Sequence, residues 1–135
     1  MAAHPIPNTA PEDIVQFSLE QEIADSERRR PWQSGVLSKT LFKSSDMRVL
    51  LVCMDQDATM DDHHADGSIS IQVLNGCIRC RVNGHSRELS QRDVLTLQPS
   101  IRHAVKAVEA SAFLLTISWP SSQKLESLEH RGYGS

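Results

Sequence analysis

The chain has 135 residues, of which 39% are hydrophobic, and a formal net charge of −3, so it is long enough for one ordinary domain with one core. Its Lys and Arg residues form no long basic stripe, which argues against a nucleic-acid partner. No apolar run approaches the length of a membrane span and no signal segment opens the chain, so we expect a cytoplasmic protein with no membrane partner.

The two ends of the chain differ in composition from its middle. Residues 1–17 and 121–135 are predicted to be flexible tails, because Pro, Ser, Gly, His and charged residues are frequent in them. Residues 18–31 are predicted to form an N-terminal helix that begins with the capping-box pattern Ser18-Leu-Glu-Gln21 and that Pro31 ends. Residues 32–120 remain for a single β domain.

Short strands separated by turns fill that domain. In residues 69–74, the apolar residues Ile69, Ile71 and Val73 lie at every second position, and Asn75-Gly76 and Asn83-Gly84 are dipeptides typical of tight hairpin turns. Evenly spaced short strands of this kind predict an antiparallel sandwich or barrel. The predicted strands are Ser38–Lys43, Met47–Met54, Ile69–Leu74, Cys77–Val82, Ser86–Leu89, Val94–Leu97, Ala104–Val108 and Ala112–Ser118.

The three cysteines are predicted to be reduced thiols. Cys77 and Cys80 have the C-x-x-C spacing of redox and zinc sites, but residues three apart in a strand point to opposite faces. We therefore expect two separately packed thiols, with Cys77 the more reactive because it shares a face with Arg79 and Arg81. Cys53 is predicted to lie in the core.

The order of these elements resembles the two-motif layout of the cupin superfamily. The segment Asp62-His63-His64 precedes Ile-Ser-Ile-Gln-Val-Leu-Asn-Gly76, and Gln98-Pro-Ser-Ile-Arg-His103 precedes a final apolar strand that ends in Ser-Trp-Pro120. In particular, the chain is similar to the small single-domain, RmlC-like cupins. The resemblance covers roughly residues 32–120, and it implies an all-β fold, a double-stranded β-helix or jelly-roll barrel, with a short N-terminal helix.

The resemblance also implies a set of metal ligands. The cupin motifs have the forms G-x5-H-x-H-x3-4-E-x6-G and G-x5-P-x-G-x2-H-x3-N, and their histidine positions fall on Asp62, His64 and His103. The position of the glutamate falls on Ile69. Two imidazoles and one carboxylate suit a divalent transition metal such as iron, manganese, zinc or nickel, whereas the loss of the glutamate favours a barrel without metal.

A second interpretation of the same residues needs no metal. His63 in place of His64 would pair with His103, and such a pair could exchange protons or hydrogen-bond an anionic ligand. Arg102, next to His103, could neutralise a carboxylate at the barrel mouth. His63, His64, His103 and Arg102 are therefore the candidate ligand-binding residues.

Two functions follow from these interpretations. One is an enzyme in which the metal promotes oxygenation, isomerisation or decarboxylation of a small organic acid. The other is a non-catalytic module that binds or senses a small molecule without metal. The resemblance also implies a homodimer, for which the predicted strands Leu37–Phe42 and Met47–Met54 would supply the edges.

Overall fold

The computed structural model of the protein describes residues 13–63 and 65–120, including all their side chains except those of Asp62 and His63. The described part contains one α-helix, one 3-10 turn and nine strands. Their bounds are α1 Leu19–Glu27, η2 Gln33–Gly35, β1 Val36–Lys43, β2 Met47–Met54, β3 Thr59–His63, β4 Ser68–Asn75, β5 Cys77–Val82, β6 His85–Ser90, β7 Val94–Leu97, β8 His103–Ala107 and β9 Ser111–Ser118.

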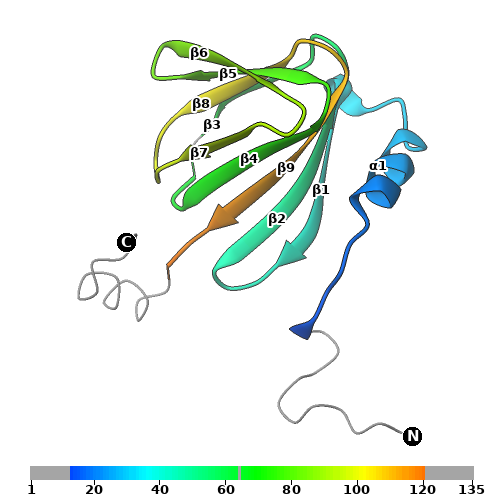
Figure 1. Cartoon of the computed structure of the whole chain (residues 1–135), viewed down its shortest axis with the longest axis horizontal. Helices are drawn as coiled ribbons and strands as arrows, with labels where there is room; N and C mark the ends of the chain where they lie inside the picture. Colours follow the sequence, from blue (N-terminus) through cyan, green and yellow to red (C-terminus); the bar gives the residue numbers. More distant parts are fainter. Residues whose placement is uncertain (1–12, 64, 121–135) are drawn as a thin grey trace, which may run out of the picture.

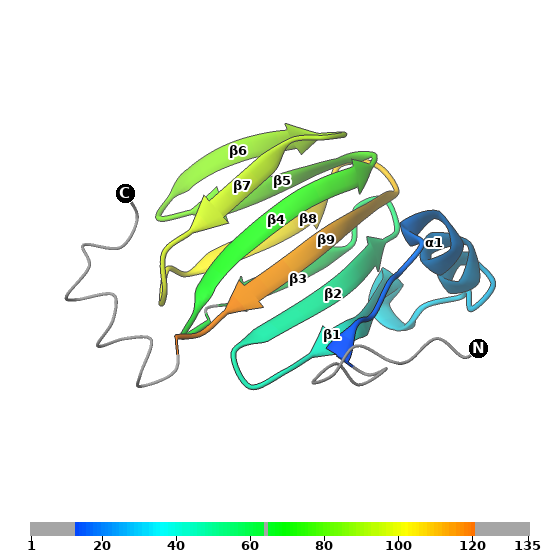
Figure 2. The same cartoon turned by 60° about the horizontal axis from the view of Figure 1, so that its bottom comes forward.

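The strands form two antiparallel sheets that pack face to face (Figures 1 and 2). The five-stranded sheet has the order β1-β2-β9-β4-β7, and the four-stranded sheet has the order β3-β8-β5-β6. Chain neighbours such as β3 and β4 belong to different sheets, as in a jelly roll. The predicted all-β jelly roll with a short N-terminal helix is therefore confirmed.

The strand bounds agree closely with the sequence pattern, with one exception. Three predicted strands, Met47–Met54, Cys77–Val82 and Val94–Leu97, have the predicted ends. Strand β3 was not predicted, because its residues Thr-Met-Asp-Asp-His neither alternate nor form an apolar run. Main-chain pairing with β8 along the edge of the four-stranded sheet makes this segment a strand.

The helix begins as predicted and ends earlier. Ser18 is the N-cap, and its side-chain oxygen accepts a hydrogen bond from the amide of Gln21 at 3.2 Å. The last helical residue is Glu27, because Arg29 and Arg30 donate their amides to Ser26 and Glu27 in tighter turns. The predicted tails fall mostly on residues 1–12 and 121–135, which lie outside the described residues.

Side chains from both sheets form the inner core. Phe113 of β9 is the largest of the fully buried side chains. Alternate residues of each strand point into this core, so strand parity tells which residues can reach the interior. The buried members are Val52, Met54, Ile69, Ile71, Val73, Ile78, Cys80, Leu89, Val105, Ala107 and Phe113.

A second core lies on the outer face of the five-stranded sheet, under α1 and the residues that follow it (Figure 1). Trp32 packs there against Leu51, Cys53 and Ala112, and its indole nitrogen donates to the carbonyl oxygen of Ser26 at 2.9 Å. The guanidinium of Arg30 lies 4.0 Å from the centre of the Trp32 ring. Trp32 therefore fastens the N-terminal segment to the sheet.

The topology corrects one expectation about sheet edges. β2 lies between β1 and β9, so Met47–Met54 is a central strand and offers no edge for pairing. Among the described strands, β1 and β7 are the edges of the five-stranded sheet. Within residues 13–63 and 65–120, no helix has the length and apolar character needed to span a bilayer.

Replacing Trp32 tests the outer core. We expect Trp32→Ala to lower the free energy of unfolding by about 3–5 kcal/mol, because it removes a large buried aromatic side chain. Trp32→Phe should cost about 0.5–1.5 kcal/mol, since it removes the indole hydrogen bond while the Ser26 carbonyl keeps the amide of Arg29 as a donor. Urea unfolding followed by circular dichroism measures both values. Equal stability of Trp32→Phe and wild type would show that the indole hydrogen bond contributes nothing.

Candidate functional site

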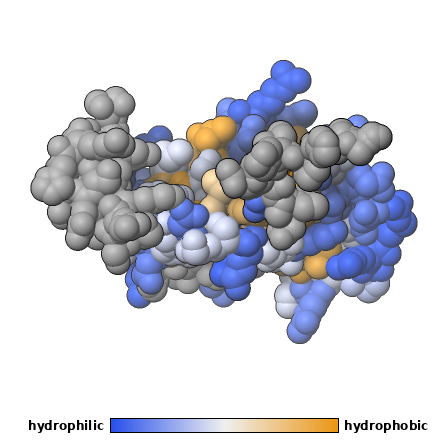
Figure 3. All heavy atoms as spheres, turned by 90° about the horizontal axis from the view of Figure 1, so that it is seen from below, coloured by the Kyte–Doolittle hydropathy of each residue, from blue (hydrophilic) through white to orange (hydrophobic). Residues whose placement is uncertain are grey.

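The candidate site lies at the end of the two sheets where β2 begins and β9 finishes. β4 begins and β7 finishes at this end, and β3 finishes and β8 begins there. Figure 3 views the protein from below, and apolar surface is visible there between hydrophilic residues. We call this end the barrel mouth.

Of the predicted metal ligands Asp62, His64 and His103, His103 is the one that the structure describes completely. It begins β8 and is 6% exposed, on the same strand face as the buried residues Val105 and Ala107. Its Nδ1 lies 3.3 Å from the carbonyl oxygen of Ile101. The imidazole therefore belongs to the interior of the mouth, as a metal ligand or a ligand-binding group would require.

A bulge in β3 determines which neighbour lies opposite His103. Met60 pairs with Val105, and His63 pairs with His103, so three steps along β3 match two steps along β8. One extra residue therefore lies in β3 between the two pairs. A regular ladder from Met60 would have brought Asp62 opposite His103, and the bulge brings His63 there instead. This register is the one that the metal-free interpretation requires.

Arg48 is a residue of the mouth that the sequence analysis missed. It lies near the start of β2 and has the parity of Val52 and Met54, which point into the inner core. Its Nε is buried and has no hydrogen-bond partner in residues 13–63 and 65–120, and its guanidinium lies 5.6 Å from the centre of the Trp119 ring. A single charged residue in an otherwise apolar strand was the signal that could have drawn attention to it.

Trp119 is held beside Arg48 by a close approach of the backbone. Its amide donates to the carbonyl of Asp46 at 2.9 Å. A Cβ built on Gly67 would lie 2.3 Å from the carbonyl oxygen of Ser118 and 3.1 Å from the Trp119 ring. Only a glycine lets the start of β4 pack this closely against the end of β9, so the position of the indole depends on Gly67.

Two rows of paired residues can be traced at the mouth from the sheet registers. In the five-stranded sheet, Arg48 pairs with Ile117, Ile117 with Ile69, and Ile69 with Leu97. In the four-stranded sheet, His63 pairs with His103 and His103 with Val82. The first row is apolar except for its cation, and the second contains both histidines.

Of the three predicted metal ligands, the described side chains include only that of His103. Ile69, in the place of the motif's glutamate, is 5% exposed and packs in the inner core. Its row supplies one guanidinium and no carboxylate, and a guanidinium repels a divalent cation. No group of three or more metal-binding side chains occurs among the described residues.

The other predicted site residues are placed as follows. Arg102 is exposed and directly precedes β8. Asp62 lies in β3 at the bulge, and its side chain lies outside the description, as does that of His63. His64 lies outside the described residues altogether.

The cysteines lie on two faces of β5, as their spacing predicted. Cys80 is buried in the inner core, whereas Cys77 is half-buried and its Sγ lies 3.8 Å from a carboxylate oxygen of Glu88. Burial raises the pKa of the Cys80 thiol to about 11 and also raises the pKa of the Cys53 thiol. All three cysteines are free thiols.

Solved structures of cupins are similar to this chain. The cupin domain of Cnp3 from Schizosaccharomyces pombe shares 19% identity over 90% of this chain and 82% of its own, with a TM-score of 0.65. A cupin superfamily protein from Desulfitobacterium hafniense shares 17% over 70% and 86%, with a TM-score of 0.64. KdgF from Halomonas sp. shares 22% over 67% and 84%, with a TM-score of 0.60.

Identities of this size establish the fold alone. No family model matches the sequence. No curated protein matches it either.

Thiol labelling tests the placement of the cysteines. With iodoacetamide at pH 8, we expect Cys77 of the folded protein to react first, because Cys53 and Cys80 are buried and their pKa values are raised. Mass spectrometry of tryptic peptides identifies the labelled residue. Cys77→Ser should remove the fast reaction, whereas labelling of Cys80 at the same rate in the native protein would contradict the buried position.

Proposed function

We propose that this chain, which has the fold of a small cupin, binds a small organic acid at the barrel mouth without a metal. One observation carries the proposal: Arg48 directs a guanidinium with a buried, unpartnered Nε into the mouth, among the described residues. A buried donor without an acceptor costs about 1–3 kcal/mol, and a carboxylate supplies the acceptor.

The surroundings of Arg48 support an anionic ligand. Its row continues through Ile117, Ile69 and Leu97, so a carboxylate there would be shielded from water on one side. Electrostatic attraction and charged hydrogen bonds are stronger at such a place than in bulk water. The ring of Trp119 lies against the guanidinium and would limit the directions in which it can turn.

The histidines would act on the other end of the ligand. His63 and His103 occupy paired backbone positions in β3 and β8. A neutral imidazole can donate or accept a hydrogen bond, and a protonated one adds a positive charge. We assign to this pair the recognition of a second polar group of the acid, and to Arg102 the outer rim of the mouth.

Metal-dependent catalysis is the competing proposal. Oxygenation, isomerisation or decarboxylation through iron, manganese, zinc or nickel would require Asp62 and His64 to join His103 as ligands. The register of β3 favours His63 opposite His103, and Arg48 places a cation in the facing sheet. For these reasons the metal-free function is preferred. The homodimer and the cytoplasmic location stay predictions.

Arg48→Met tests the binding site. We expect it to abolish binding of succinate or citrate, measured by isothermal titration calorimetry. The reason is that Arg48 is the only cation among the described residues of the row Arg48, Ile117, Ile69 and Leu97. The same variant without ligand should be as stable as wild type or more stable, since it removes a buried donor that lacks an acceptor.

His103→Gln should weaken binding roughly tenfold or more through the lost imidazole, whereas the exposed Arg29→Gln should leave it unchanged. A structural role alone for Arg48 would appear as a stability loss above about 2 kcal/mol in Arg48→Met, with no acid bound by wild type. That result would overturn the proposal.

Elemental analysis tests the metal question. Protein purified without an affinity tag should contain iron, manganese, zinc and nickel far below one ion per chain, and His103→Ala should not change these contents. About one ion per chain in wild type that is lost in both His103→Ala and Asp62→Asn would instead establish the metal site. Treatment with a chelator should leave the binding of the acid unaffected.

A further inference from the structure

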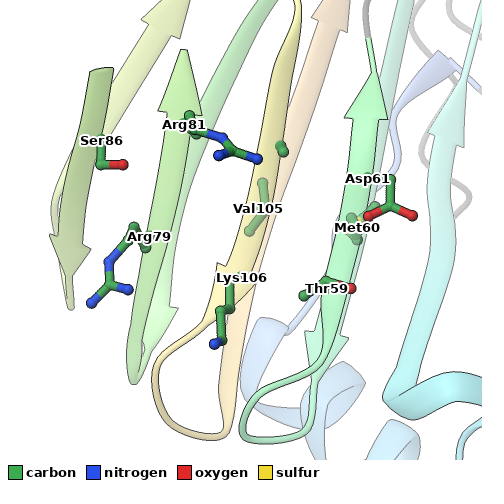
Figure 4. A pocket seen from close by; sticks show the side chains of 9 residues that line it. Thr59, Met60, Asp61, Arg79, Arg81, Ser86, Val105 and Lys106 are labelled. Atoms are coloured by element: carbon green, nitrogen blue, oxygen red, sulfur yellow. The ribbon is translucent and has the colours of Figure 1, made fainter. Parts of the chain in front are cut away.

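A second hollow lies on the outer face of the four-stranded sheet, away from the barrel interior (Figure 4). Its volume is about 320 Å³, which is at the small end of the range for ligand pockets. Strands β3, β8, β5 and β6 all contribute to it. The polar residues around it are Thr59, Asp61, Arg79, Arg81, Ser86 and Lys106.

The hollow exists because one short side chain lies among long ones. Ala104 of β8 is paired with Arg81 of β5, and Arg81 is paired on its other side with Ser86 of β6. Lys106 lies two residues further along β8, on the same face. The methyl group of Ala104 therefore forms the floor. Figure 4 shows the guanidinium of Arg81 extended from β5 toward β8.

The charges on this face are not balanced. Arg79 lies directly opposite Lys106, and like charges at such positions repel each other. Arg79 donates to Glu88 at 2.9 Å, and this hydrogen bond lowers the pKa of the Glu88 carboxyl. Arg81 and Lys106 have no ion pair or hydrogen bond with any residue of the described part of the chain. The two central strands thus present two unpaired cations, and the carboxylate of Asp61 on β3, which also lines the hollow, forms no ion pair with either of them.

We propose that this hollow binds the phosphate group of a small molecule. The guanidinium of Arg81 can bond two oxygens in parallel, and the ammonium of Lys106 supplies a point charge. Ser86 and Thr59 add hydroxyl donors at the rim. A carboxylate has two oxygens and one charge, whereas a phosphate monoester has three terminal oxygens and nearly two charges, so it uses this donor set more fully.

This site is separate from the mouth. Arg79 and Arg81 point outward from β5, while their neighbours Ile78 and Cys80 point into the inner core. An anion bound over Ala104 therefore has the sheet itself between it and Arg48. The proposal does not depend on the function proposed for the barrel mouth.

Amide NMR titrations with inorganic phosphate and with glycerol phosphate test the proposal at constant ionic strength. We expect saturable shifts at Arg81, Ala104 and Lys106 for both probes. The double variant Arg81→Gln/Lys106→Gln should weaken binding roughly tenfold or more, because both charged contacts are lost. Arg29→Gln, which removes an exposed charge elsewhere, should leave the affinity unchanged.

A variant that fills the hollow separates a built site from diffuse attraction. Ala104→Leu keeps every charge and should block glycerol phosphate, since its side chain would occupy the floor. Tighter binding of the ester than of inorganic phosphate identifies a phosphorylated metabolite as the ligand, and the reverse identifies the free ion.

Several results would overturn the proposal. They are the absence of saturable shifts, shifts confined to the mouth around Arg48, and unchanged binding in Ala104→Leu or in the double variant. Binding of an acidic peptide but of neither phosphate probe would likewise replace a small-molecule site by a protein-docking face. Because Arg81 and Lys106 are exposed, both variants should fold, which circular dichroism checks.

Discussion

The rest of the structure depends on the burial of β2 on both of its faces. Val52 and Met54 point into the inner core, whereas Leu51 and Cys53 lie beneath Trp32 and the N-terminal segment. The relative exposures of these four residues are between 0% and 2%, so neither face of the strand can turn toward water. This double burial fixes the strand's register and its parity. Because Arg48 lies six residues before Met54, it is on the same inward face of β2, at the mouth.

A local irregularity on the opposite sheet has an equal effect. The extra residue in β3 shifts the parity of every later position in that strand, so His63 and not Asp62 comes opposite His103. In a strand that pairs along its full length, the register determines which residues face each side of the sheet. The chemistry of the mouth is therefore set by backbone geometry in β3 and by packing in β2, rather than by the identity of the histidines alone.

The same distinction explains how much the sequence could predict. Strands β4 and β5 could be predicted because their apolar residues alternate and because turn dipeptides follow them. The bounds of β2 were predicted from its apolar run, but such a run does not indicate which face Arg48 occupies, since both faces of β2 are apolar. β3 could not be predicted, because its polar residues form a strand only through pairing with β8. Register and bulges arise from contacts between distant segments, and these leave no local pattern.

The two proposed anion sites differ in what supports them. In the mouth, a buried Nε without an acceptor in the described part of the chain lowers stability by about 1–3 kcal/mol, so an energetic cost points to a missing carboxylate. On the outer face, Arg81 and Lys106 are exposed and their repulsion is weakened by water and salt, so energy alone indicates no ligand. There the geometry carries the inference: Ala104 opens space where the neighbouring strands present two cations and two hydroxyls. Because β5 directs Cys80 inward and Arg81 outward, one strand separates the two sites and lets each change without the other.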